Sequence, residues 1–237
     1  MNTAIVIPTY NEKNNIRPLV KEILDIAPDV KIIIVDDNSP DGTGKIADEL
    51  AGIYQNLKVT HRKKREGLGK AYITGFKEAL KMSPDYIMQM DADFSHNPKY
   101  IPLFLKEITG CDVVIGSRFI DGHKRPANVS FLSLWAKGYA TFILGLKITD
   151  CLGGFKCFSR KVAEEVELDK FISKGFVFQV EFIYRSLKKG FLIHEIPIVF
   201  CQRKSGLTKK SHNIICEAFF KVLLFKLFLR NRANGVR

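Results

Sequence analysis

The chain has 237 residues, of which 46% are hydrophobic and 26% are charged, and it carries a net charge of +12. Such a composition is typical of one large globular domain with a substantial core. The excess of positive charge indicates an anionic partner: nucleic acid, an anionic membrane surface or a phosphorylated substrate. Five widely spaced cysteines without a CxxC pair argue against a disulfide framework or a zinc cluster and suit a reducing compartment.

The first half of the chain alternates between short apolar segments and helical patterns. Its amino-terminal stretch, MNTAIVIPTYNE, turns polar too early for a signal peptide, so we expect the protein to act on the cytoplasmic side. The expected strands are nearly continuous apolar runs, typical of strands buried on both faces, and they are residues 3–8, 30–37, 57–62, 85–91 and 111–117. The expected helices between them are residues 12–27, 41–54, 67–82 and 97–109. This alternation predicts an α/β fold with a parallel sheet, whose ligands bind beyond the carboxyl ends of the strands.

The second half contains two strongly apolar helical segments. Residues 131–148 carry large apolar side chains along one stripe, which fits either a helix packed on the core or a helix lying in a membrane interface. Residues 216–230 are apolar nearly all round, and as one helix they reach ~22 Å, too short to span a bilayer. We therefore expect a main domain over residues 1–212. Over 213–237 we expect an amphipathic helix that lies on the membrane surface or binds a membrane-embedded partner subunit.

Aspartates follow two of the expected strands at the points where those strands should end. Asp37 follows the second strand, and Asp91 and Asp93 follow the fourth. Neighbouring carboxylates oppose each other's ionisation, so a positive charge is needed beside them. The D-x-D spacing suits Mg²⁺ or Mn²⁺ bridging a diphosphate, because carboxylate oxygens are hard ligands and the ion keeps positions open for phosphate and water. The alternative is that Asp91 and Asp93 cap the helix that begins at Asn97.

The motif GLGKA (67–71) places two glycines at the start of a helix, where free backbone N–H groups can approach a ligand. It is not a phosphate-binding P-loop, because Lys70 is followed by Ala71 and the first glycine lies too close to the lysine. The sequence therefore excludes a motor that hydrolyses ATP or GTP.

Seven short motifs occur in a characteristic order along the chain. They are IPTYNE (7–12), VDDNSPDGT (35–43), GLGKA (67–71), MDADFSHNP (90–98), GSRF (116–119), GFVFQVE (175–181) and EIPIVF (195–200). Together they resemble the inverting family-2 glycosyltransferases of GT-A fold, most closely the branch of dolichyl (polyprenyl) phosphate mannosyltransferases. The resemblance implies a Rossmann-like, mostly parallel sheet flanked by helices, a catalytic domain over residues 1–212, and C-terminal amphipathic helices at a membrane interface.

The resemblance assigns roles to individual residues on the nucleotide and metal side of the site. The family's nucleotide-binding first loop matches Pro8, Tyr10 and Glu12. The acidic residue that contacts the nucleoside matches Asp37, and the metal-binding pair matches Asp91 and Asp93. Ser95 stands where some members of the family carry a metal-ligating glutamine.

The resemblance also assigns residues on the phosphate, sugar and acceptor side. Basic residues that face the phosphates match Arg118, Arg203 and Lys209, and the segment lining the sugar pocket matches Gln179 and Glu181. In the helix after GSRF, the family binds the acceptor phosphate with an arginine and a serine, but this chain has Leu132 and Ala136 at those positions. The acceptor site is therefore altered, or its role passes to Lys124, Arg125 or Lys137.

The implied reaction is the transfer of mannose from GDP-mannose onto a polyprenyl or dolichyl phosphate at the cytoplasmic face of a membrane, with Mg²⁺ or Mn²⁺ as cofactor. A phosphate monoester has its second pKa near ~6 and is largely dianionic at neutral pH, so it needs no general base. One alternative is a family-2 enzyme that uses a UDP-sugar such as UDP-glucose or a hydroxyl acceptor, which requires a base such as Glu181 or Asp150. A second alternative is a basic nucleic-acid-binding module, but the chain has no aromatic-plus-basic recognition stretch, so we expect no nucleic acid partner.

Overall fold

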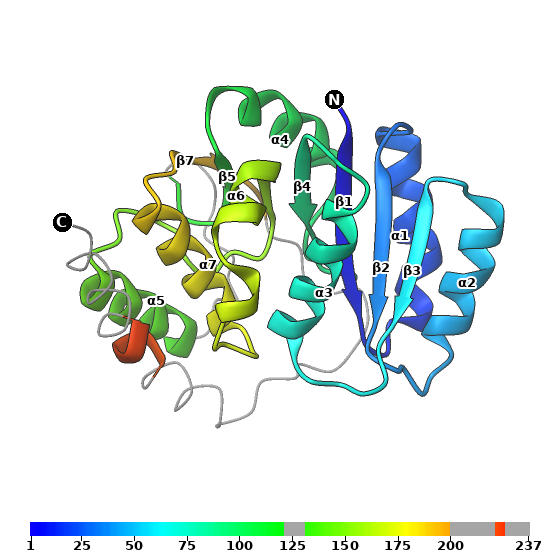
Figure 1. The fold of residues 1–237 in the computed structure, drawn as a ribbon, viewed down its shortest axis with the longest axis horizontal. Helices are drawn as coiled ribbons and strands as arrows, with labels where there is room; N and C mark the ends of the chain where they lie inside the picture. Colours follow the sequence, from blue (N-terminus) through cyan, green and yellow to red (C-terminus); the bar gives the residue numbers. More distant parts are fainter. Residues whose placement is uncertain (121–130, 200–220, 226–237) are drawn as a thin grey trace.

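The computed structural model of the protein describes residues 1–120, 131–199 and 221–225, with the backbone alone described over 131–137. The described residues form a seven-stranded sheet with the strand order β3-β2-β1-β4-β6-β5-β7 (Figure 1). The strands are β1 (Thr3–Thr9), β2 (Lys31–Asp36), β3 (Leu57–His61), β4 (Tyr86–Gln89), β5 (Val113–Ser117), β6 (Lys156–Ser159) and β7 (Ile193–Pro197). The five strands expected from the apolar runs are all present, each shorter or longer by a few residues at its ends.

Helices cover both faces of the sheet. They are α1 (Lys13–Ile26), α2 (Thr43–Ile53), α3 (Leu68–Leu80), α4 (Ile101–Glu107), α5 (Phe131–Leu144), α6 (Arg160–Glu165) and α7 (Val177–Lys188), with short 3₁₀ turns at Pro98–Tyr100, Ile108–Gly110 and Leu168–Lys170. One buried cluster joins the sheet to α1, α2 and α4, and a second joins it to α3, α5, α6 and α7. The predicted α/β fold with a mostly parallel sheet between two layers of helices is confirmed.

One strand departs from the expected parallel arrangement. β6 is antiparallel to both β4 and β5, between which it lies, whereas the other described pairings are parallel. β6 therefore starts at the edge of the sheet where β4 and β5 end. This direction brings the segment just before it, residues 150–155, to the same edge as the loops that follow the parallel strands.

The close packing of α3 against the sheet depends on one glycine. A Cβ atom on Gly75 would lie 2.2 Å from Cγ1 of Val6 and 3.0 Å from Cγ2 of Val35, which are side chains of β1 and β2. Without that atom, the helix approaches both strands closely. Its first turn is thereby placed near the carboxyl edge of the sheet, at the bottom of Figure 1.

The two apolar segments of the second half are partly described. The expected helix over 131–148 is observed as α5 and ends before Gly145, which has φ +64°. Within the described side chains of α5, Ala140 is buried in the core and Phe142 is 84% exposed, and Leu146, just beyond the helix, is also buried. The described part of the helix therefore packs on the core. Of the expected C-terminal helix, residues 221–225 are described; they are helical, and Val222 and Phe225 join the same core cluster. No helix within the described part of the chain is both long and apolar enough to cross a membrane.

Candidate active site

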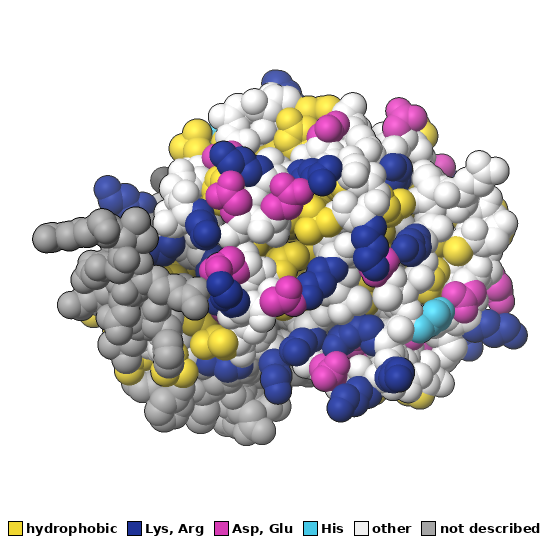
Figure 2. Space-filling view, viewed as in Figure 1, with side chains coloured by type: hydrophobic (Ala, Val, Ile, Leu, Met, Phe, Trp, Pro, Cys, Tyr) yellow, Lys and Arg dark blue, Asp and Glu magenta, His cyan; other side chains and the backbone are white. Residues whose placement is uncertain are grey.

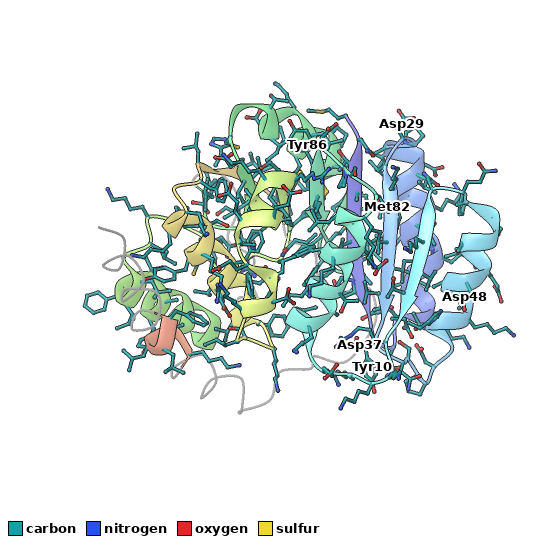
Figure 3. The ribbon with its side chains drawn as sticks, viewed as in Figure 1. Tyr10, Asp29, Asp37, Asp48, Met82 and Tyr86 are labelled. Carbon is teal, nitrogen blue, oxygen red and sulfur yellow. The ribbon has the colours of Figure 1, made fainter. Side chains whose placement is uncertain are left out.

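Three loops with unusual backbone geometry meet at the carboxyl edge of the sheet. They follow β1, β2 and β4, and each contains one non-glycine residue in the left-handed region: Asn11 (φ 58°), Asn38 (φ 57°) and Phe94 (φ 63°). Tyr10 and Asp37, at the ends of the first two strands, lie close together at this edge in Figure 3. Such conformations are uncommon, above all for a residue as bulky as Phe94, and they concentrate at functional sites.

Asp91 is the more exposed of the two aspartates after β4, with 23% of its side chain accessible. Its Oδ1 accepts a hydrogen bond of 2.7 Å from the Tyr72 hydroxyl on α3. The Asp91 backbone N–H donates to Nδ1 of His96 over 3.0 Å, so the ring proton of the neutral imidazole lies on Nε2, 3.9 Å from Asp91 Oδ2. Burial lowers the pKa of His96, which favours this neutral form. Asp91 is therefore a carboxylate held in a fixed orientation by its neighbours.

Asp93 is 4% exposed and stabilises the tight turn after Asp91, because its Oδ1 accepts the backbone N–H of Ser95 over 3.0 Å. The alternative role for the two aspartates, capping the next helix, is wrong, because the side chain of Asn97 itself accepts the Lys99 N–H at that helix start. Among the described residues, no three His, Cys, Asp or Glu side chains converge on one point. A cation held by this pair would need further ligands, such as the water or phosphate oxygens that Mg²⁺ usually keeps.

The neighbouring loops carry two arginines that the sequence analysis did not single out. The Arg65 guanidinium lies 4.4 Å from the centre of the Tyr10 ring. Arg62 forms an ion pair with Asp37, and burial nevertheless raises the pKa of that carboxyl. Both arginines belong to the basic run HRKKRE (61–66) after β3, and Lys and Arg side chains gather along the lower edge of the molecule beneath α3 (Figure 2). The signal for them was this charge run directly after a strand.

The other residues predicted for the nucleotide loop have structural partners. Pro8 is half-buried within β1, opposite Val35 of β2. Glu12 accepts a hydrogen bond from Asn15 over 2.8 Å, and its backbone N–H donates to Oγ1 of Thr43 over 2.9 Å. These contacts join the loop after β1 to the start of α2.

Arg118, which follows β5, is held by a buried carboxylate. Its Nε and Nη2 donate to the two oxygens of Asp150 over 2.7 and 2.8 Å, and its backbone N–H donates to Oδ2 over 3.1 Å. Asp150 is fully buried. Burial lowers the pKa of Arg118, but the hydrogen bond and charge of Asp150 outweigh it, so the net pKa of the guanidinium is raised and Arg118 stays charged.

Two glycines allow the segment before β6 to pass between Asp91 and the Arg118–Asp150 pair. A Cβ atom on Gly154 would lie 3.0 Å from Cε1 of His96 and 3.5 Å from Oδ2 of Asp91. On Gly153 it would lie 3.1 Å from the carbonyl oxygen of residue 116 and 3.4 Å from Cγ of Asp150. Asp91 and the Asp150 partner of Arg118 therefore both lie against one glycine-containing segment at a common edge of the sheet. The Gly-Gly dipeptide was the available sequence signal for it.

A buried polar cluster lies under this segment. Gln179 on α7 accepts hydrogen bonds of 2.6 Å from Gln89 Nε2 and from Lys156 Nζ, and Lys156 also donates to the carbonyl oxygen of Gly153. Burial lowers the pKa of Lys156 to about 7. Gln179, predicted to line a sugar pocket, is thus fixed beneath the glycine-containing segment, at 1% exposure.

Glu181, the other residue predicted on α7, is also fully engaged. It is 0% exposed; it forms an ion pair with Arg185 at 2.9 Å and accepts the backbone N–H groups of Ile172 and Ser173 over 3.2 and 2.9 Å. These contacts hold the chain that precedes α7. The predicted Arg203 and Lys209 lie outside the described residues, as do Lys124 and Arg125 and the side chains of Leu132, Ala136 and Lys137.

Comparison with known proteins identifies the family. The model of glycosyl transferase family 2 matches residues 4–167, which is more than half of the chain and includes every site residue described above except those on α7 and the segment before it. The chain belongs to glycosyltransferase family 2. Among curated relatives of this glycosyltransferase, the polyprenol monophosphomannose synthase of Mycolicibacterium smegmatis is 39% identical over 99% of this chain and 91% of its own length. The undecaprenyl-phosphate mannosyltransferase of Micrococcus luteus is 36% identical over 97% of this chain and 96% of its own length.

Solved structures share the fold of this glycosyltransferase at low sequence identity. Glucosyl-3-phosphoglycerate synthase of Mycobacterium tuberculosis, in complex with phosphoglyceric acid, matches with a TM-score of 0.65 and 18% identity over 95% of this chain and 79% of its own. A mannosyltransferase of Pyrobaculum calidifontis in complex with GDP-Man and Mn²⁺ matches with a TM-score of 0.58 and 14% identity over 98% of this chain and 69% of its own. The predicted GT-A fold and the predicted family are both confirmed.

Proposed function

We propose that this glycosyltransferase moves mannose from GDP-mannose onto a polyprenyl or dolichyl phosphate, with inversion at the anomeric carbon. The observation that carries the proposal is the similarity to two polyprenyl-phosphate mannosyltransferases at 39% and 36% identity over nearly the whole length of all three chains. The geometry supports it, because carboxylates and a charged arginine flank one segment at the edge of the sheet where α/β folds bind their ligands.

In this proposal Asp91 and Asp93 would hold Mg²⁺ or Mn²⁺, which would supply positive charge to stabilise the departing diphosphate. Arg118 faces the same diphosphate as a fixed cation, and Arg203 and Lys209 add further positive charge. Asp37 and Tyr10 bind the nucleoside together with Arg62 and Arg65, whose contacts already join the loops after β1, β2 and β3. Pro8 and Glu12 shape the first of these loops.

The acceptor supplies its own nucleophile in this reaction. A phosphate monoester is largely dianionic at neutral pH, so its oxygen attacks without a general base. A hydroxyl acceptor needs one, but Glu181 and Asp150, the two candidates, are fully buried and bonded to Arg185 and Arg118. A base must present an oxygen to the proton that it removes. Gln179 and Glu181 therefore serve as fixed supports beneath the sugar pocket rather than as a base.

We place the enzyme as a peripheral protein on the cytoplasmic face of a membrane, where a polyprenyl phosphate resides in lipid. Phe142 is 84% exposed on α5, and Leu223 and Leu224 are 41% and 37% exposed on the segment 221–225, whose Val222 and Phe225 belong to the same core cluster as Ala140 of α5. Apolar side chains on a cationic protein favour direct contact with anionic lipid. Binding to protein-free vesicles distinguishes this contact from anchoring by a separate membrane subunit.

The test of the proposed function is an incubation with Mn²⁺, a polyprenyl phosphate and radiolabelled GDP-mannose or UDP-glucose in parallel, followed by organic extraction. We expect label in the organic phase with GDP-mannose. Label from UDP-glucose supports the UDP-sugar alternative, and label in water-soluble product alone supports a hydroxyl acceptor, an outcome in keeping with Leu132 and Ala136 at the acceptor positions.

The acidic pair is tested with Asp91→Asn and Asp93→Asn, each of which removes one carboxylate without changing its shape. We expect each variant to lose at least ~100-fold in turnover, because charge on the leaving group is no longer offset. The matched control is Asp25→Asn, which changes an exposed carboxylate paired with Lys21 on α1. Normal turnover in either active-site variant, with the fold intact by circular dichroism, would contradict the assignment.

A further inference from the structure

Glu195 on β7 reaches the segment that carries Asp150. Its Oε2 accepts the backbone N–H of Thr149 over 2.7 Å, and its Oε1 accepts the Thr149 hydroxyl over 2.8 Å and the Asp150 N–H over 2.9 Å. One half-buried carboxylate thereby fixes the backbone of two consecutive residues and the side chain of the first. Glu195 is the first residue of the motif EIPIVF, whose first three residues belong to β7. The proposed function gives this motif no role.

The contacts continue from this segment to the active-site arginine. Asp150 accepts three hydrogen bonds from Arg118, and the Thr149 hydroxyl lies 2.7 Å from the hydroxyl of Ser117, the residue before that arginine. Glu195 is thus linked to Arg118 by two routes, one through Asp150 to the guanidinium and one through the Thr149 and Ser117 hydroxyls to the residue before Arg118. Arg118 itself is not touched by Glu195 in any of these bonds.

The Glu195 carboxylate is not needed to hold β7 in the sheet. The pairing of β7 with β5 already secures the strand, through the register from Val113 with Ile193 to Ser117 with Pro197. Backbone N–H groups such as those of Thr149 and Asp150 are satisfied elsewhere in proteins by neutral acceptors or water. Glu195 instead brings a second negative charge next to the residue that carries the buried Asp150 carboxylate, and like charges disfavour each other. Arg118 donates to the carboxylate of Asp150, and Glu195 accepts the backbone N–H of the same residue, so the arginine and Glu195 meet at Asp150.

We propose that Glu195 is a positioning residue for Arg118: it fixes Thr149 and Asp150 so that the guanidinium is held toward the departing diphosphate. The inference rests on the proposed function in one respect, the role of Arg118 at the leaving group. A group that acts on charge developing in the transition state affects kcat more than ground-state binding, and small displacements of such a group cause large losses of rate.

The variant that tests this is Glu195→Gln, which keeps the shape of the side chain. If its amide oxygen accepts from the Thr149 hydroxyl and the Asp150 N–H, its NH₂ group faces the Thr149 N–H, and two donors cannot bond. We expect kcat to fall ~10-fold while KM for the nucleotide sugar changes less than ~3-fold. The control is Glu107→Gln, which changes a carboxylate 3.9 Å from His194, the residue before Glu195 in the same strand, and should leave kcat unchanged.

A double variant distinguishes positioning from general structural support. If Glu195 acts through Arg118, adding Glu195→Gln to Arg118→Met should lower kcat by less than ~2-fold further, because the two changes remove one shared interaction. Multiplied losses would overturn the proposal, and so would an unchanged kcat in the single variant. As a readout independent of catalysis, hydrogen exchange at Arg118 Nε–H, followed by NMR, should be faster in Glu195→Gln than in the wild type, and an equal rate would also overturn it.

The assay separates this inference from the proposed function. If the wild-type enzyme uses another nucleotide sugar or another acceptor, the proposed substrates are wrong, but a diphosphate still departs and the Glu195 measurements are made with that substrate pair. If instead the wild type transfers mannose to polyprenyl phosphate and the Glu195→Gln variant does so equally well, the proposed function stands and the positioning role fails. Thr149→Val, which removes one hydroxyl and keeps both N–H bonds, should fall between the wild type and Glu195→Gln in kcat.

Discussion

Asp91 and Asp93 stand two residues apart, yet the fold places them in different surroundings. Asp91 is partly exposed and is oriented by Tyr72, whereas Asp93 is nearly buried and stabilises the turn with the Ser95 N–H. Partners in the second layer around a metal ligand fix its orientation, and their loss typically costs 10–100-fold in metal affinity. If Asp91 binds a metal as proposed, the Tyr72 hydroxyl is one of the groups that orient it for that role.

Removal of that hydroxyl is the first prediction at the level of single residues. Tyr72→Phe keeps the ring stacked on Phe178, where the centroids are 5.9 Å apart, and deletes the bond to Asp91. We expect ~10-fold weaker binding of Mn²⁺ in the presence of GDP, measured by electron paramagnetic resonance of the free ion. Tyr86→Phe, at the other end of β4, is the control and should bind as the wild type does. Unchanged affinity in Tyr72→Phe would show that Asp91 needs no such support.

A second prediction concerns the buried Lys156. Burial lowers its pKa from 10.5 to about 7, so between pH 7 and pH 10.5 the unfolded chain binds more protons than the folded one. Stability therefore rises with pH across this window, and the cost of burying the charge is greatest below pH 7. Relative to Lys156→Met, the wild type should gain ~1–3 kcal/mol in unfolding free energy between about pH 7 and pH 9.5, measured with urea in the absence of metal. The exposed Lys161→Met should show no such trend, and a flat difference for Lys156→Met would contradict the depressed pKa.

A residue was easier to predict from the sequence when the feature that gives it its role lies close to it along the chain. Asp37, Asp91 and Asp93 could be picked out from the sequence, because carboxylates directly after apolar strands indicate a site at the carboxyl edge of the sheet. Tyr72 and Lys156 were not, because their significance arises from partners 19 and 23 residues away that meet them only in the folded chain. A buried lysine reads in the sequence as an ordinary surface cation.

Among the elements, α3 is the one whose position depends most directly on a single residue. Gly75→Ala adds a methyl group at the point where Val6 is only 2.2 Å away, so the helix must move off β1 and β2. We expect a loss of ~1–3 kcal/mol in unfolding free energy, despite the better helix propensity of alanine. Gly52→Ala in α2, where nothing lies within 4 Å, is the matched comparison and should gain up to ~1 kcal/mol. Equal stability changes in the two variants, measured by urea unfolding, would contradict the close packing of α3.

The length and residue pattern of each strand explain which strands could be predicted from the sequence. The strands of the first half are long apolar runs between helical patterns, and they were located to within a few residues. β6 has four residues, KCFS, and begins with a lysine, so neither its length nor its pattern distinguishes it from a loop. Its antiparallel direction is set by the path of the chain through α5 and the glycine-containing segment, and local periodicity carries no information about that path.

For the whole molecule, the net charge of +12 and the exposed apolar side chains near α5 predict binding to anionic membranes. The protein should sediment with phosphatidylglycerol vesicles but not with neutral ones, and binding should weaken as salt rises from about 50 mM to about 500 mM. Phe142→Ser should weaken binding ~10-fold, since burying a phenylalanine is worth ~1.5–3 kcal/mol. Leu192→Ser changes a 60% exposed side chain at the start of β7, away from α5, and should have no effect. Equal binding to neutral and anionic vesicles would contradict the electrostatic part of the prediction.

The position of β6 has a consequence for how the enzyme is made. β4 and β5 lie in the first half of the chain, but the strand that joins them comes from residues 156–159 and must be translated before either has its shared neighbour. A nascent polypeptide that stops short of this point has an unfinished sheet and lacks the glycine-containing segment beside Asp91. Prematurely terminated products therefore cannot form the proposed site, which is complete only once the late strand has joined β4 to β5.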